Sequence, residues 1–88
     1  MRSISYVDGS AAAGPLSEAL GFDLTAAHIQ CAGCAHHGPL AEGHLYARGP
    51  GLTLRCPECE HVLLRLALAG RDAWLDMRGL RTIQVATS

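Results

Sequence analysis

The chain of 88 residues is poor in aromatic side chains and contains no lysine. Its four aromatic residues are Tyr6, Phe22, Tyr46 and Trp74, so the sequence predicts an aliphatic core. All seven basic residues are arginine, set against eight acidic ones, which gives a formal charge of −1. A nucleic-acid binder neutralises phosphates with a basic patch, so this charge balance disfavours nucleic acid as a partner.

Long apolar runs are also missing. No stretch approaches the roughly 18 apolar residues of a membrane span, and residues 1–5 lack the roughly 7–15-residue apolar segment of a secretory signal. We therefore expect no membrane contact and a cytoplasmic location, where thiols stay reduced.

Several enzyme motifs are absent as well. The sequence has no His-Glu-x-x-His, no phosphate-binding glycine loop and no nucleophile elbow. A zinc deaminase needs His-x-Glu and Pro-Cys-x-x-Cys, but here the proline follows Cys56 and no His-x-Glu occurs. We therefore expect a protein that is not an enzyme.

The chain does have four cysteines, in two Cys-x-x-Cys pairs: Cys31 with Cys34, and Cys56 with Cys59. Two such turns can bring four thiolates onto one cation, the tetrahedral sulfur shell typical of structural zinc sites. No cysteine is left over for a disulfide or a redox thiol. The sequence predicts one zinc ion held by these four residues. We expect folding to depend on it, because so short a chain buries only a marginal core.

Three histidines lie close to these pairs: His36, His37 and His61. Each is a possible metal ligand by residue type. Four thiolates already complete the shell that zinc prefers, so we expect the histidines to be neighbours of the site rather than ligands.

Turn residues divide the chain into an N-terminal arm, residues 1–24, and a β-rich domain, residues 25–88, which together form one compact domain. In the arm, Gly14 and Pro15 are expected to open a short helix that Gly21 closes. Strands are expected over residues 25–30, 44–48, 52–55, 62–68, 73–78 and 80–85. The predicted fold is a small, metal-stabilised zinc ribbon with an antiparallel sheet, a short N-terminal helix and a C-terminal β-hairpin.

Alternation along residues 62–68 places Leu64 and Leu66 on one face of the strand, and Leu63 and Arg65 on the other. In the arm, the face of the helix that carries Leu16 can dock either on the protein's own sheet or on a partner.

Two rows of side chains have both a structural and a functional interpretation. His44, Tyr46 and Arg48 share one face of a strand, and this row is either a recognition strip or an ordinary solvated face. Trp74 begins a similar row. If it is exposed it indicates a partner site, and if it packs against the helix it belongs to the core.

Six short segments together resemble a bacterial family of small zinc-ribbon proteins of unknown function. They are Asp8-Gly9 with Ala12-Ala13-Gly14, Leu16-Ser17-Glu18, Cys31-Ala32-Gly33-Cys34, Pro50-Gly51-Leu52, Arg55-Cys56-Pro57-Glu58-Cys59 and Trp74-Leu75-Asp76-Met77-Arg78-Gly79. The resemblance spans nearly the whole chain. It implies a zinc ribbon with four cysteine ligands and supplies no established activity.

The cysteine turns are also similar to those of rubredoxin, an iron electron carrier whose second pair likewise begins Cys-Pro. Rubredoxin has glycine after each pair, where this chain has Ala35 and Glu60, and its aromatic core is missing here. Both differences argue against iron.

The sequence thus favours a non-catalytic zinc ribbon that binds another protein or serves as a small accessory or regulatory subunit. Two alternatives remain open. One is a nucleic-acid-binding zinc ribbon, which rests on analogy and on four arginines within residues 62–88. The other is a rubredoxin-like iron electron carrier.

Overall fold

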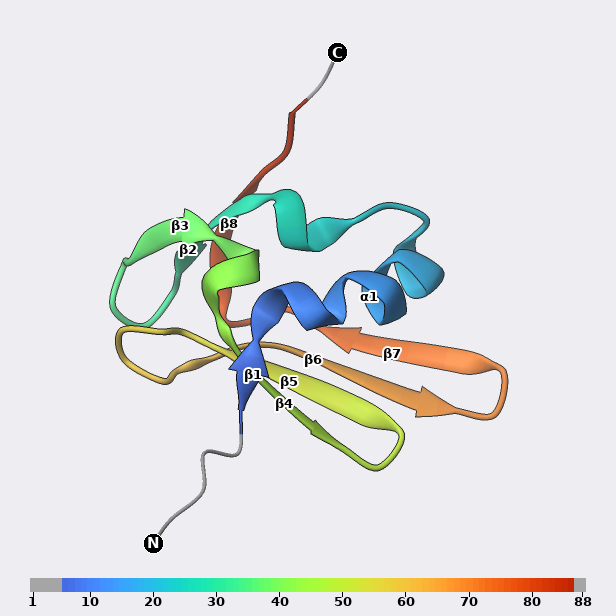
Figure 1. Ribbon diagram of the computed structural model, residues 1–88. Coiled ribbons are helices and arrows are strands. Elements are labelled where there is room, and N and C mark those ends of the chain that lie inside the picture. Colours follow the sequence, from blue (N-terminus) through green and yellow to red (C-terminus); the bar gives the residue numbers. More distant parts are fainter. Residues whose placement is uncertain (1–5, 87–88) are drawn as a thin grey trace, which may run out of the picture.

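The computed structural model describes residues 6–86, which form two antiparallel sheets joined by short helical segments (Figure 1). The larger sheet has the strand order β1-β4-β5-β6-β7, with β1 (Val7–Asp8), β4 (His44–Arg48), β5 (Gly51–Arg55), β6 (Val62–Ala69) and β7 (Asp72–Asp76). The smaller sheet has the order β3-β2-β8, with β2 (His28–Cys31), β3 (His37–Pro39) and β8 (Leu80–Gln84). The predicted small, β-rich, antiparallel domain is confirmed.

One short α-helix, α1 (Ala13–Leu20), follows the first strand. It begins two residues before Pro15 because a 3₁₀ helix, η1 (Gly9–Ala12), leads directly into it; Asp8 starts η1 by accepting the N–H of Ser10 at 2.9 Å. The helix ends where the sequence predicts, at Gly21, whose φ of 84° is readily adopted only by glycine. Two further 3₁₀ helices are η2 (Leu24–Ala26) and η3 (Leu40–Glu42).

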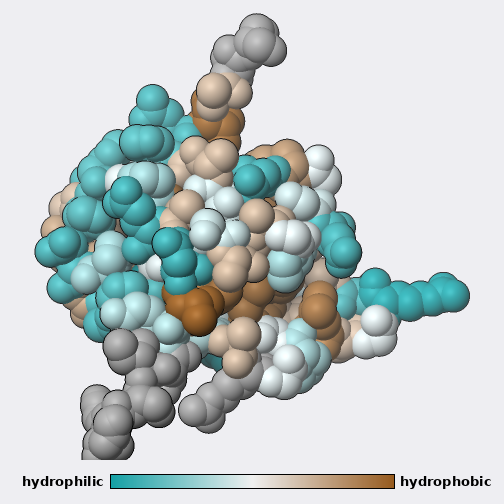
Figure 2. Space-filling view, in the orientation of Figure 1, coloured by the Kyte–Doolittle hydropathy of each residue, from teal (hydrophilic) through white to brown (hydrophobic). Residues whose placement is uncertain are grey.

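The core is aliphatic, as predicted. Leu16 of α1 is fully buried in the same core as the sheet leucines, so this face of the helix docks on its own domain. Phe22 and Trp74 lie outside the core with half or more of their surface exposed. On the face shown in Figure 2, the hydrophobic residues occur in small separate groups among hydrophilic ones. The largest fully buried side chains are Leu16, Leu24, Leu40, Leu54, Leu63, Leu64, Leu66, Cys31 and Cys56.

The strand expected over residues 25–30 begins later, at His28. The side chain of Asp23 accepts the backbone N–H of Thr25 at 3.0 Å, and this cap holds residues 24–26 in a 3₁₀ turn. Local side-chain capping therefore overrides the strand preference of this segment.

The strand β6 departs from simple alternation. Leu54 pairs with Leu64 and Arg55 pairs with Val62, so Leu63 is an extra residue in a bulge. Leu63 and Leu64 are both buried as a result, and the prediction that Leu63 shares the face of Arg65 is wrong.

After β7, the chain leaves the larger sheet and β8 pairs with β2, with Ile29 opposite Ile83. The crossing occurs at Gly79, where a Cβ would lie 1.8 Å from the carbonyl oxygen of Val62. Only glycine allows the backbone to pass so close to β6. This crossing brings the end of β2, and with it Cys31, beside the larger sheet. None of the helices within residues 6–86 has the length and apolar character needed to cross a membrane.

Candidate metal centre

The four cysteines meet at the ends of β2 and β5, and their Sγ atoms all lie within 4.8 Å of one another. The Sγ–Sγ distance is 3.8 Å between Cys31 and Cys59, and 3.7 Å between Cys34 and Cys56. A tetrahedron with metal–sulfur bonds of about 2.3 Å has edges of about 3.8 Å. The cluster therefore has the size of a four-sulfur metal shell, and these residues could hold one metal ion.

The two cysteine turns have the same pattern of backbone hydrogen bonds. In the first, the carbonyl of Cys31 accepts the N–H of Ala35 at 2.9 Å, and the N–H of Cys31 donates to the carbonyl of His36 at 2.9 Å. The second turn, which begins at Cys56, repeats both bonds at equivalent positions, with lengths of 2.9 and 2.8 Å. Two copies of one turn thus face each other across the sulfur cluster.

Backbone N–H groups point at two of the sulfur atoms. Gly33 donates to Sγ of Cys31 at 3.3 Å, and Glu58 donates to Sγ of Cys56 at 3.4 Å. Burial raises the pKa of the Cys56 thiol. Burial also opposes ionisation of Cys31, but the backbone N–H groups of Cys34 and Gly33 outweigh it and hold the pKa of Cys31 below its ordinary value. These donors stabilise the thiolates that a metal requires.

Each turn closes with a residue in the left-handed conformation: φ is 68° at Ala35 and 65° at Glu60. This conformation costs a residue with a Cβ about 1–2 kcal/mol. The chain therefore forms the turn that glycine would allow without having glycine there. The absence of glycine at these two positions is therefore a weaker argument against iron than the sequence suggested. The remaining argument against iron is the missing aromatic core.

The strain at Glu60 coincides with a network of side-chain contacts that we call the Glu60 cluster: Tyr6, His44, Tyr46, Arg55 and Glu60. The carboxylate of Glu60 accepts the hydroxyl of Tyr46 at 3.0 Å and lies 2.6 Å from Nδ1 of His44. Its backbone carbonyl accepts Nη1 of Arg55 at 2.9 Å. The ring of Tyr6 stacks on His44 with centroids 3.8 Å apart. Burial, followed by the neighbouring Glu60, raises the pKa of Tyr46, so its hydroxyl stays protonated and donates.

At Ala35, the equivalent position of the first turn, the corresponding support is a single bond. Nε2 of Gln30 donates to the carbonyl of Ala35 at 3.3 Å, as Arg55 does to Glu60 in the second turn. The alanine side chain can add no hydrogen bond of its own. The second turn is therefore the one that side chains tie to the sheet.

The sequence matches the model of one protein family over residues 3–88. The chain belongs to the family of unknown function DUF6510. This match confirms the expectation of an uncharacterised family. No curated protein and no solved structure matches the chain.

In this DUF6510 chain, the group of residues 6–86 that could hold a metal consists of the four predicted cysteines and contains no histidine. His61 instead packs its ring over the first turn, where a Cβ on Gly33 would lie 3.0 Å from Cγ of His61. The small residue in the first turn thus makes room for a side chain from the second.

Two members of the row of His44, Tyr46 and Arg48 are not simply part of a solvated face, because they contact Glu60. His44 and Tyr46 are half-buried members of the Glu60 cluster, and the side chain of Arg48 lies outside the part of the chain that the structure describes. Sequence reasoning missed the roles of Glu60 and Tyr6 in this DUF6510 chain. The available signal was the glutamate directly after Cys59, at a position where the turn favours glycine.

Proposed function

We propose that the protein is a non-catalytic zinc ribbon in which Cys31, Cys34, Cys56 and Cys59 bind one Zn²⁺. The observation that carries this proposal is the geometry of the four Sγ atoms: two of their distances, 3.8 and 3.7 Å, match the edge of a tetrahedral sulfur shell, and all four atoms lie within 4.8 Å of one another. Four thiolates suit zinc among the divalent metals, and they suit a compartment such as the cytoplasm, where thiols stay reduced.

The role of the ion is structural. Four sulfur ligands leave no position for a bound water or substrate, which a catalytic zinc site keeps open. Bound zinc contributes roughly 10–16 kcal/mol of apparent binding free energy at neutral pH. That contribution matters here, because the two turns carry backbone strain and the aliphatic core is small.

We further propose that the zinc ribbon acts by docking on another protein, as an interaction module or as a small accessory or regulatory subunit. Trp74 supports this proposal, since its exposed fraction of 65% is high for the only tryptophan of the chain. With four thiolates and one divalent ion, the formal charge becomes −3, and this charge repels the phosphates of a nucleic acid.

Chelation tests the structural role of zinc. Because the free energy of zinc binding contributes to the stability of the fold, chelation at neutral pH should unfold the chain and abolish its cooperative thermal transition. Cys56→Ser should have the same effect. Native spectra and cooperative unfolding in the metal-free protein would contradict the proposal.

Co-purification tests the docking role. The tagged wild-type protein, expressed in its native cells and treated with nuclease, should retain a stoichiometric protein partner that the unfolded Cys56→Ser variant does not retain. If nucleic acid co-purifies from untreated lysate in place of a protein, the result would favour the alternative of a nucleic-acid-binding zinc ribbon and contradict the docking role.

A further inference from the structure

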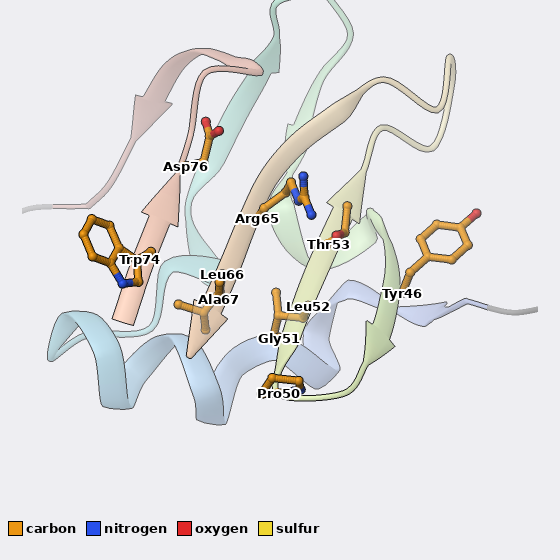
Figure 3. A pocket seen from close by; sticks show the side chains of 10 residues that line it. All are labelled: Tyr46, Pro50, Gly51, Leu52, Thr53, Arg65, Leu66, Ala67, Trp74 and Asp76. Carbon is orange, nitrogen blue, oxygen red and sulfur yellow. The ribbon is translucent and has the colours of Figure 1, made fainter. Parts of the chain in front are cut away.

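The outer face of the larger sheet is hollowed between two aromatic side chains. Tyr46 of β4 forms one wall and Trp74 of β7 forms the other, while Thr53 and Ala67 contribute to a floor of small residues (Figure 3). Arg65 also lines the hollow, from β6. The leucines that alternate with Thr53 along β5 are buried on the opposite face. The hollow is therefore a surface of the finished domain rather than a defect of its core.

The strand register gives the size of the hollow. Tyr46 pairs with Thr53, Thr53 pairs with Arg65, and Ala67 pairs with Trp74, so two strands separate the aromatic walls. Three strand spacings amount to about 14 Å across the strands, and Trp74 is offset by two residues along β7 from Asp76, the residue in the same row as Tyr46. An extended peptide covers this distance with about four residues. The hollow is too wide for a single side chain, and it fits a short extended segment that lies across the strands.

The charged side chains that line the hollow are Arg65 and Asp76, which are opposite each other in the pairing of β6 with β7. Asp76 is already held by Arg78, with Nη2 donating to Oδ2 at 2.6 Å. Arg65 is exposed and forms no ion pair with any residue that the structure describes. Its guanidinium group is free to meet an anionic partner beside the floor of the hollow.

We propose that this hollow binds an extended acidic segment of a partner protein. One apolar side chain would pack on Trp74, a second, about four residues away, would pack near Tyr46, and a carboxylate between them would accept hydrogen bonds from Arg65. This inference rests on the proposed protein-docking function and adds the surface and the chemistry of the peptide to it.

Two other occupants fit less well. A second copy of the chain could pair with the free edge of β7. Antiparallel self-pairing centred on Trp74 would place Asp72 opposite Asp76, and like charges directly opposite each other destabilise a strand pair. A nucleic acid needs several cations spaced along its phosphates, whereas Arg65 is the one arginine among the residues that line the hollow.

A selection from random short peptides, displayed on phage and panned on the zinc-loaded protein, tests the inference. Counter-selection on zinc-loaded Trp74→Ala removes peptides that bind elsewhere, and this exposed position should tolerate the change. We expect enriched sequences to carry Asp or Glu between two apolar residues about four positions apart. Because Trp74 is the only tryptophan, synthetic versions of these peptides should shift its fluorescence emission to the blue.

Affinities measured by calorimetry should fall at least about tenfold in Trp74→Ala and in Arg65→Glu. Arg81→Glu is the matched control: it makes the same change of charge at an exposed position of β8, in the other sheet, and should bind as the wild type does. Equal losses in both arginine variants would indicate a general charge effect and would overturn the assignment of the site.

The remaining outcomes distinguish a failure of the proposed hollow from a failure of the proposed protein-docking function. Enrichment of basic peptides, or no enrichment over the counter-selection, would overturn the inference. Enriched peptides that leave the tryptophan emission unchanged would place docking on another surface, so that the inference fails while the docking function stands. Nanomolar binding of single-stranded RNA that Arg65→Glu weakens would overturn both.

Discussion

The two cysteine turns allow an internal comparison at the residue that closes each of them. Ala35 and Glu60 have the same left-handed backbone, with φ of 68° and 65°, but only Glu60 has side-chain partners. Glycine at either position relieves strain of about 1–2 kcal/mol. It also gives the unfolded chain additional entropy, which costs about 0.4–1 kcal/mol. The backbone contribution should therefore be the same in both variants and close to neutral or slightly stabilising.

The side-chain contribution should differ. Ala35→Gly removes one methyl group from an exposed residue. Glu60→Gly removes the bond from Tyr46 at 3.0 Å and the contact with His44 at 2.6 Å. A hydrogen bond contributes about 0.5–1.5 kcal/mol, and the 47% exposure of the Glu60 side chain reduces this contribution. We expect Glu60→Gly to be less stable than Ala35→Gly by about 1–2 kcal/mol.

Denaturant unfolding in a zinc-buffered solution measures this difference directly. Competition with a coloured chelator should give the same ranking, with zinc held about tenfold more weakly by Glu60→Gly, because about 1.4 kcal/mol corresponds to a factor of ten. Glu60→Gln keeps an acceptor for Tyr46 and should fall between the two glycine variants. If Glu60→Gly is as stable as Ala35→Gly, the Glu60 cluster does not support the turn and our interpretation of it is wrong.

Three further predictions concern the crossing at Gly79, the histidines and the acidic end of β7. Gly79→Ala should lower the free energy of unfolding by about 3 kcal/mol or more, measured by thermal unfolding, because the added Cβ would meet the backbone of β6. Gly14→Ala has open space at its Cβ and should stabilise α1 by up to about 1 kcal/mol. Equal effects of the two variants would contradict the close crossing. His36→Ala, His37→Ala and His61→Ala should each keep one zinc per chain, as measured by mass spectrometry. Loss of metal from a folded variant would show that the set of four cysteine ligands is misassigned. The neighbouring guanidinium of Arg78 lowers the pKa of Asp76 from 3.8 to about 2, so the stabilisation from this pair is present above pH 3.8 and is lost as the pH falls through about 2. An NMR titration should show the pKa of Asp76 returning toward 3.8 in Arg78→Gln, and an unchanged pKa would refute the pairing.

Much of this architecture can be predicted because local sequence patterns specify it. The strand over residues 44–48 has the predicted bounds, and those over residues 52–55 and 62–68 differ by one residue at one end. Gly21 ends the helix through a conformation that only glycine readily adopts. The spacing of the cysteines sufficed to predict the cluster, because two Cys-x-x-Cys turns have few other uses in so short a chain.

The features that the sequence did not reveal depend on residues far apart in the chain. The strand β8 pairs with β2, some fifty residues earlier, and no local pattern specifies that partner. The Glu60 cluster joins Tyr6 to Glu60 through His44, a contact that exists only once β1, β4 and the second turn are in place. The bulge that buries Leu63 likewise arises from pairing with β5. Periodicity predicts faces and turns, and tertiary pairing decides the rest.

The metal content of protein purified without added metal tests the central claim most directly. Elemental analysis of the colourless protein should give one zinc per chain, and the analysis of Cys34→Ser should give much less than one. A red preparation loaded with iron would favour the rubredoxin-like alternative. A folded protein that carries no metal at all would contradict the claim that Cys31, Cys34, Cys56 and Cys59 form a structural zinc site.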